Sequence, residues 1–318
     1  MSVASFLNSE HSTAFSFEVL PPMRGKSIDN FYGSIDRLME FNPAYINITT
    51  HRTEVVYRHA GDGMYRCFSE IKRPGTVAIA AALKGRYGVP AVPHIICGGF
   101  SRYEIEDELI DLSYLGINDL LVLRGDRSKG ENRFNSTDNG HEHANELCQQ
   151  VEDFNCGTMV DGSNATPPTT PFTYGVAGYP EKHEEAMNME IDIENLKRKV
   201  NTGAKYIVTQ MFFDNGKYFE FVKRCRAAGI TVPIIPGIKP LTALSQMSLL
   251  PKTFHIDLPA ELSKELLQCK SNDDVKALGI EWGVAQAQEL KAAKVPSIHF
   301  YTINASTSVE AIAKRIYG

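Results

Sequence analysis

The chain has 318 residues, of which 43% are hydrophobic and 22% charged, with a formal net charge of -5. This composition is typical of a globular protein of one or two domains, and without a long basic run it argues against nucleic acid as the main partner. No apolar stretch is long enough for a transmembrane helix, and the first residues lack the charged start and apolar core of a signal peptide. The cysteines are scattered, so we expect a cytoplasmic protein away from membranes.

Short apolar runs that indicate buried strands alternate along the chain with stretches of helical periodicity. The predicted strands cover residues 14–20, 45–49, 91–96, 119–123, 172–178, 206–210, 232–236 and 297–301. The predicted helices cover residues 28–41, 77–86, 103–115, 142–154, 191–202, 217–228, 282–294 and 309–317. This alternation predicts an α/β fold with a parallel sheet closed into a (β/α)8 TIM barrel. An open doubly wound sheet is the alternative, which is less favoured because no GxGxxG follows the first strand.

Two segments exceed what such a barrel needs, and a third has weaker patterning. Residues 52–74 form a long connection after the second strand. Residues 155–170 are rich in Gly, Ser, Thr, Pro and Asn, which predicts a surface loop or flexible insertion. Residues 249–274 have weaker patterning and are expected to add short helices. Because no linker divides the chain, we expect a single catalytic barrel domain over residues 1–318.

The first predicted strand carries one carboxylate, Glu18, in a largely apolar run that Pro21 and Pro22 bring to an end. Burying a lone carboxylate is costly unless it is paired, hydrogen-bonded or protonated, so a raised pKa is expected, as in a general acid. A structural interpretation is equally compatible with this segment alone, with Glu18 satisfied by an arginine or facing solvent on an edge strand.

Polar residues follow at least six of the predicted strands, where a (β/α)8 barrel carries its active site. Each one alone has a plainer explanation, such as a turn with a local ion pair or a satisfied core histidine. Together they indicate an active site, because the barrel brings all strand ends to one mouth. No HExxH, GxSxG or P-loop is present, which argues against a metal site, a serine hydrolase and a P-loop enzyme. The residues are Glu18, Asn47, Thr49, His51, His94, Arg124, Asp126, Tyr179, His183 and Gln210.

In sequence and order, these motifs resemble the methylenetetrahydrofolate reductase family in its short bacterial form. The resemblance extends over nearly the whole chain. The matching motifs are Phe17-Glu18 with Pro21-Pro22, Pro93-His94, Leu123-Arg124-Gly125-Asp126, Ala177-Gly178-Tyr179-Pro180-Glu181 with His183, Asn195-Leu196-Lys197-Arg198-Lys199, Thr209-Gln210 with Phe212-Phe213-Asp214, Ile235-Pro236-Gly237-Ile238 and His299-Phe300-Tyr301-Thr302-Ile303-Asn304.

The resemblance implies non-covalent FAD and reduction of 5,10-methylenetetrahydrofolate to 5-methyltetrahydrofolate by NADH or NADPH, in two half-reactions that share one site. It also implies a homo-oligomer whose product supplies methyl groups for methionine synthesis. By position, Glu18 matches the family's general acid and Asp126 the carboxylate near the flavin and the pterin. Substrate-binding positions are matched by Gln210, Gln246, Phe212 and Leu250. Cofactor-binding positions are matched by Thr49, His94, Arg124, Gly125, Asp126, Ala144, Tyr179, His183, Asp192, Asn195, Arg198 and Lys199.

The chain also departs from the family's pattern. Ala305 replaces an arginine that helps to hold the glutamate tail of the folate, and Leu250 replaces an aromatic residue near the folate ring. The chain ends just after the last predicted helix, so the regulatory domain of long eukaryotic forms is not expected.

Two other function classes share some of these features. A flavin-free barrel methyltransferase would bind a pterin but would not need the helix that carries Asn195, Arg198 and Lys199. A non-catalytic sensor of folate or flavin is disfavoured by a carboxylate in a buried strand.

Overall fold

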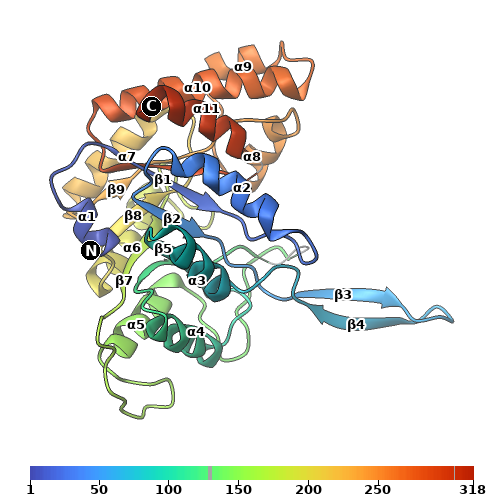
Figure 1. Ribbon diagram of the computed structural model, residues 1–318, viewed down its shortest axis with the longest axis vertical. Coiled ribbons are helices and arrows are strands. Elements are labelled where there is room, and N and C mark those ends of the chain that lie inside the picture. Colours follow the sequence, from blue (N-terminus) through green and yellow to red (C-terminus); the bar gives the residue numbers. More distant parts are fainter. Residues whose placement is uncertain (128–130, 304) are drawn as a thin grey trace.

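A computed structural model describes residues 1–127, 131–303 and 305–318. Among these residues, nine parallel strands form one sheet in the order β10-β11-β1-β2-β5-β6-β7-β8-β9 (Figure 1). The strands are β1 (Ala14–Val19), β2 (Tyr45–Ile48), β5 (Ala91–Ile96), β6 (Asp119–Leu123), β7 (Thr173–Gly178), β8 (Tyr206–Thr209), β9 (Ile234–Ile235), β10 (Gly237–Ile238) and β11 (Ser297–Tyr301).

The sheet closes on itself at Pro236, which separates β9 from β10. Proline has no N–H to donate to a sheet ladder, so it divides one strand position into two short pieces. β9 pairs with β8, and β10 pairs with β11. The two ends of the strand order are therefore one segment of chain, and the predicted (β/α)8 TIM barrel is confirmed.

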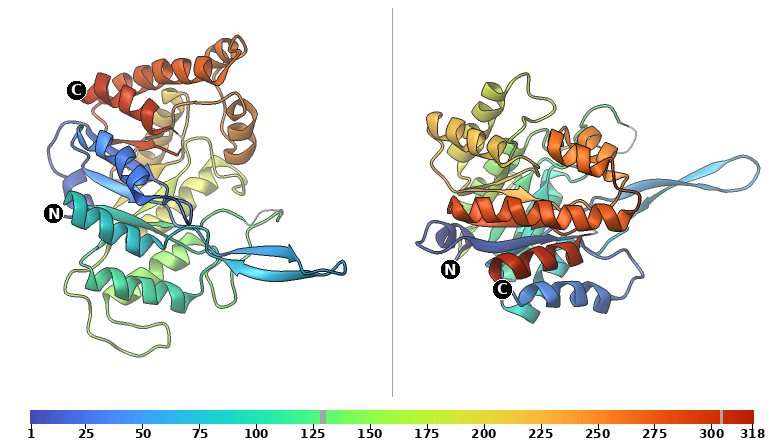
Figure 2. Two further views of the ribbon diagram at one scale, coloured as in Figure 1. Left: turned by 45° about the vertical axis from the view of Figure 1, so that its right-hand side comes forward. Right: turned by 90° about the horizontal axis from the view of Figure 1, so that it is seen from above.

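Helices cover the outside of the barrel, one after each strand position (Figure 2). Their starts are set by capping side chains, as at Ser27, Ser101 and Asn188. The helices are α2 (Ile28–Met39), α3 (Thr76–Tyr87), α4 (Arg102–Tyr114), α5 (Ala144–Asn155), α6 (Met189–Thr202), α7 (Asn215–Ala227), α10 (Asn272–Ala292) and α11 (Ser306–Tyr317).

The segments beyond the basic barrel form a hairpin, two short helices and a loop. The region 52–74 forms an antiparallel hairpin of β3 (Glu54–His59) and β4 (Tyr65–Glu70), where the sequence predicted only a connection. The predicted short helices are present as α8 (Gln246–Phe254) and α9 (Ala260–Leu266). The loop after α5 leads to the start of β7, so it lies at the barrel end opposite the mouth. Among the described residues, no helix combines the length and the apolar character needed to cross a membrane.

The barrel interior has an apolar floor beneath a polar layer. The floor is made of buried side chains near the starts of the strands, and the short helix α1 (Val3–Leu7) packs beneath it. Nearer the mouth, the interior of β1, β2, β5 and β11 carries buried polar residues, which include Glu18, Asn47, His94 and His299. The main apolar core lies outside, between the strands and the helices. The floor residues are Tyr45, Val92, Leu121, Tyr206, Val208 and Ile235, with Val3, Ala4 and Leu7 of α1.

Candidate active site

Glu18 lies near the C-terminal end of β1 with its side chain in the barrel interior. It is 6% exposed. The parallel register places it beside Asn47 of β2 and Tyr301 of β11. Burial raises the pKa of Glu18 to about 8, although the positive charge of Lys239 lowers it. The side chain is therefore a neutral acid near pH 7, as the sequence predicted.

His94 contacts Glu18 from β5, with its Nε2 atom 3.6 Å from Oε2 of the acid. Burial lowers the pKa of His94 to about 3, and the charge of His51 adds to this effect, so the imidazole is neutral. Among the described residues, neither His94 Nε2 nor the side-chain N and O atoms of Asn47 have a hydrogen-bond partner. Each buried polar atom left without a hydrogen bond costs about 1–3 kcal/mol of stability. A polar ligand that bonds to these atoms of Asn47 and His94 would remove that cost.

Lys239 follows β10 and is a part of this site that the sequence pattern did not single out. Its side chain is buried, and its Nζ donates to the carbonyl of Ile303 at 2.8 Å. Burial lowers the pKa of Lys239 to about 8, while Glu18 raises it. The Thr302 hydroxyl donates to the backbone carbonyl of Glu18. The segment after β11 is thus tied both to the acid's strand and to Lys239.

A second group of predicted residues meets at the rim formed by the segments after β6 and β7. The guanidinium of Arg124 donates to Glu185 at 2.5 Å. The backbone N–H of His183 donates to Asp192 at 2.9 Å. The rings of Tyr179 and His183 meet edge to face, with centroids 4.7 Å apart. The structure therefore brings these predicted cofactor residues together.

Helix α6 carries the remaining predicted cations. The ammonium of Lys199 is turned inward and donates to the carbonyl of Ala177 at 2.8 Å, and burial lowers its pKa. Asn195 and Arg198 are exposed on the same helix, and Arg198 pairs with Glu194 at 2.9 Å. The cations of this helix thus lie beside the rim but hold partners within the chain.

The other predicted cofactor positions lie at strand ends and on the loops after them. Asp126 is exposed after β6, and Thr49 follows β2. Ala144 is the first residue of α5. Gly125 has a φ of +83°, a conformation that favours glycine. Thr49, Gly125 and Asp126 thus follow strand ends, and Ala144 begins a helix.

The predicted substrate residues Gln210, Gln246 and Leu250 all have contacts within the chain. Gln210 accepts a hydrogen bond from the backbone of Met211, and Gln246 accepts one from the backbone of Thr242. Leu250 is buried in the small core beneath α8 and α9.

Phe212 and Ala305 pack in the main apolar core outside the barrel. Phe212 is fully buried and stacked on Tyr218 in the core outside the barrel. Ala305 is 2% exposed and packs in the same core. The position where the resembling family carries its tail-binding arginine therefore faces the core in this chain.

The chemistry of the residues present is compatible with a flavin dinucleotide. The unpaired atoms of Asn47 and His94 could bond to the polar edge of a ring system. Arg124, Arg198 and Lys199 could provide cations for a diphosphate if they left their present partners. Within the described ranges, no group of three or more His, Cys, Asp or Glu side chains is arranged to hold a metal ion.

The chain is similar to known reductases along almost its entire length. The family model described as "Methylenetetrahydrofolate reductase" matches residues 3–317. A Salmonella typhimurium relative, "5,10-methylenetetrahydrofolate reductase", is 30% identical over 299 residues, which cover 93% of this chain and 88% of the relative.

Longer relatives match as well. An Arabidopsis thaliana relative, "Methylenetetrahydrofolate reductase (NADH) 1", is 29% identical over 310 residues, which cover 94% of this chain and 48% of the relative. A Caenorhabditis elegans relative, "Probable methylenetetrahydrofolate reductase (NADPH)", is 28% identical over 309 residues, which cover 96% of this chain and 42% of the relative. The chain spans about half the length of such relatives.

Solved structures share the fold at low identity. A Clostridium thermocellum protein, described as binding two copies of 5-methyl-5,6,7,8-tetrahydrofolic acid, matches with a TM-score of 0.59 at 13% identity and covers 100% of this chain and 98% of that chain. An oxaloacetate acetylhydrolase matches with a TM-score of 0.52 at 12% identity and covers 98% of this chain and 83% of that chain. At such identities the likeness concerns the barrel alone.

Proposed function

The chain belongs to the methylenetetrahydrofolate reductase family, and from this premise we propose that it reduces 5,10-methylenetetrahydrofolate to 5-methyltetrahydrofolate. FAD is its proposed resident cofactor, and NADH or NADPH its electron donor in a ping-pong reaction. When bound, the flavin would supply the hydride chemistry between the nicotinamide and the folate. The observation that best supports this proposal is the neutral, buried Glu18 at the mouth, 3.6 Å from His94.

Glu18 is the proposed general acid. The five-membered ring of the substrate opens to an electrophilic iminium when its leaving nitrogen is protonated. Burial keeps the proton on Glu18 near pH 7, so the acid can deliver it to that nitrogen. Asp126 is the proposed carboxylate that stabilises the resulting cation from the mouth, where its side chain is exposed.

Arg124, Arg198 and Lys199 are the proposed cations for the cofactor's diphosphate. Since they are bound to Glu185, Glu194 and the Ala177 carbonyl, they would exchange these partners for phosphate oxygens on binding. The other proposed cofactor residues are Thr49, His94, Gly125, Asp126, Ala144, Tyr179, His183, Asp192 and Asn195. Proposed substrate contacts involve Gln210 and Gln246, whose amides would turn from their present backbone partners. We propose no direct contact for Phe212 or Leu250, because both are buried.

The physiological setting follows from the same proposal. The product would supply methyl groups for methionine synthesis. We propose that the chain acts as one catalytic barrel and that copies of it form a homo-oligomer.

Purification and anaerobic reduction test the proposal. We expect a yellow protein whose extracted chromophore is FAD and not FMN. NADH or NADPH should bleach it, and methylenetetrahydrofolate should restore the colour with formation of 5-methyltetrahydrofolate. The faster of the two nicotinamides identifies the donor. A protein that neither contains nor takes up FAD, or one whose reduced form methylenetetrahydrofolate does not reoxidise, would refute the proposal.

A further inference from the structure

A cavity of about 480 Å³ lies between the start of α6, the first turns of α7 and the segment after α8. Its volume is within the range of small-molecule sites, which is about 300–1,000 Å³. None of its lining residues is among the proposed cofactor or substrate residues. Glu181 of its wall stands between Tyr179 and His183 in the sequence, but its side chain contacts α7 and the segment after α8. The cavity is therefore distinct from the proposed active site.

Glu181 is the buried polar group of this cavity, with a side chain that is 7% exposed. Its Oε2 atom accepts hydrogen bonds from Nζ of Lys217 at 2.5 Å and from the backbone N–H of Asp257 at 2.9 Å. Its Oε1 atom has no hydrogen-bond partner among the described residues. A buried carboxylate oxygen without a donor favours a ligand that supplies one.

The charges around Glu181 do not balance. Lys217 pairs with both Glu181 and Asp257, so two carboxylates share one ammonium. Asp214 lines the same cavity, and within the described ranges its carboxylate has a hydrogen bond from the backbone of Gly216 but no ion pair. Three carboxylates and one ammonium leave an excess of two negative charges.

The other cations of the lining do not offset this excess. Arg224 pairs with Glu220 at 3.0 Å, and His255 pairs with Glu184 at 2.7 Å. A metal ion is not favoured either, because in the part of the chain that the structure describes no three His, Cys, Asp or Glu side chains are arranged to hold one. The excess therefore favours an organic cation.

The lining also suits the carbon chain of such a cation. Asp214 precedes Lys217, the partner of Glu181, by three residues, which is about 4.5 Å along the axis of α7. A short methylene chain can therefore carry one ammonium to Glu181 and another to Asp214. Methylene groups pack well on apolar surface, which the cavity offers beside its charges. Its apolar lining residues are Pro180, Met189 and Phe221.

We propose that this cavity binds a short aliphatic diamine, with one ammonium on Oε1 of Glu181 and the other on Asp214. The first ammonium supplies the hydrogen bond that Oε1 lacks. Alkyl amines are protonated at neutral pH, as lysine is, so the two ammonium groups match the excess of two negative charges. The proposal goes beyond the reductase function and does not depend on it.

Isothermal titration calorimetry of the protein as purified, with 1,4-diaminobutane as the probe, tests the proposal. We expect saturable binding of one diamine per chain that weakens as salt is added, because the exposed Asp214 contact is screened. 1-Aminobutane has one ammonium and should bind at least about tenfold more weakly. The neutral 1,4-butanediol should bind more weakly still.

Two substitutions locate the site. Glu181→Gln and Asp214→Asn should each weaken diamine binding at least about tenfold. Asp214→Asn keeps the cap of α7, since asparagine caps helices about as well as aspartate, so this variant remains informative if Glu181→Gln destabilises the fold. Far-UV circular dichroism checks that both variants are folded.

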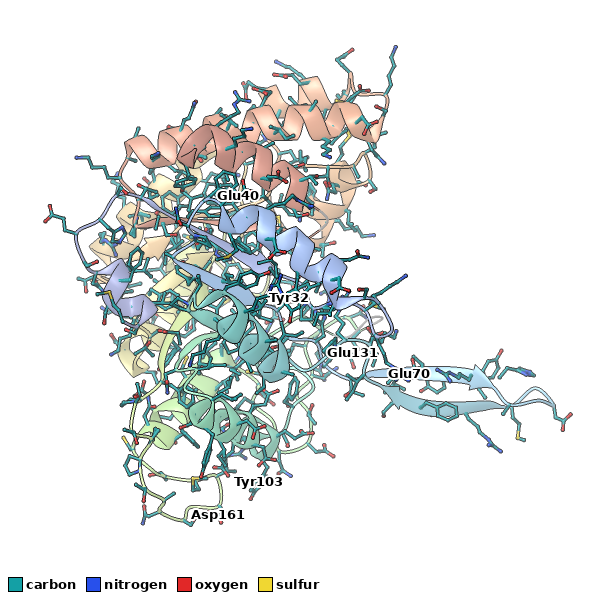
Figure 3. All side chains as sticks on the ribbon, in the orientation of Figure 1. Tyr32, Glu40, Glu70, Tyr103, Glu131 and Asp161 are labelled. Atoms are coloured by element: carbon teal, nitrogen blue, oxygen red, sulfur yellow. The ribbon has the colours of Figure 1, made fainter. Side chains whose placement is uncertain are left out.

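The matched control is Glu40→Gln, which should leave diamine binding unchanged. Glu40 is exposed directly after α2, where Figure 3 labels it, and no residue of α2 lines the cavity. The proposal is overturned if the wild type does not bind 1,4-diaminobutane, if 1-aminobutane binds as tightly, or if folded Asp214→Asn binds the diamine as the wild type does.

Discussion

Replacing Glu18 with glutamine is expected to slow the folate half-reaction and to spare the nicotinamide half-reaction. Glutamine keeps the size of the side chain but has no acidic proton for the leaving nitrogen. A general acid contributes about 10² to 10⁴-fold to a rate, which corresponds to about 3 to 5 kcal/mol of barrier. Hydride transfer from the nicotinamide needs no acid at this position and should keep its rate.

The same substitution is expected to stabilise the fold, increasingly so towards pH 8. The Glu18 pKa is raised from 4.5 to about 8 in the folded protein. Between these two values the folded state binds more protons than the unfolded state, so the free energy of unfolding falls as the pH rises. The loss reaches up to about 5 kcal/mol at pH 8. Glutamine does not ionise, so the gain in melting temperature should be small near pH 5 and largest near pH 8.

Stopped-flow flavin absorbance follows the two half-reactions separately, and thermal unfolding across the pH range follows stability. Glu10→Gln, at an exposed position, is the matched control and should change neither quantity. Equal slowing of both half-reactions would indicate damaged cofactor binding. An unchanged folate step would remove Glu18 from the chemistry. A change in stability that does not vary with pH would refute the buried neutral acid.

Three further substitutions test other contacts. Lys239→Met removes the charge that lowers the pKa of Glu18, so in stopped-flow pH profiles the decline of the folate step at alkaline pH should move to higher pH. Ala305→Arg forces a long side chain into a position that is 2% exposed, so calorimetry should show a loss of about 1–3 kcal/mol, and steady-state kinetics should show no decrease in the folate KM. Lys217→Met leaves the carboxylate of Glu181, whose side chain is 7% exposed, without its cation, and should cost about 1–3 kcal/mol in denaturant unfolding.

Most of the barrel could be predicted because its strands are short apolar runs between breakers, and three predicted strands have the observed bounds. The β3–β4 hairpin was missed because charged residues interrupt the alternation in both strands, although Gly61 and Gly63 supply the turn. The start of α10 was placed ten residues late, at 282 instead of Asn272. Gly279 weakens the helical pattern there, and the structure uses it to bring the backbone of Leu241 close to the helix.

The candidate site, too, could be predicted only in part. The burial of Glu18 could be predicted from a carboxylate in an apolar run, and Lys239 carries the same signal as a cation in an apolar run. Their coupling depends on the closure of the barrel between distant segments, which no local pattern contains. The inward packing of Phe212 depends on the direction of the backbone after β8, which residue type alone does not determine.

The apolar floor of the barrel has a consequence for the proposed general acid. Helix α1 and the buried side chains above it close the end of the barrel opposite the mouth. In the proposed reaction, a proton would therefore reach Glu18 from the mouth, the same opening that the substrate would occupy. A bound folate would then separate the deprotonated acid from bulk water until the product leaves. On this proposal, reprotonation of Glu18 would follow product release in each cycle.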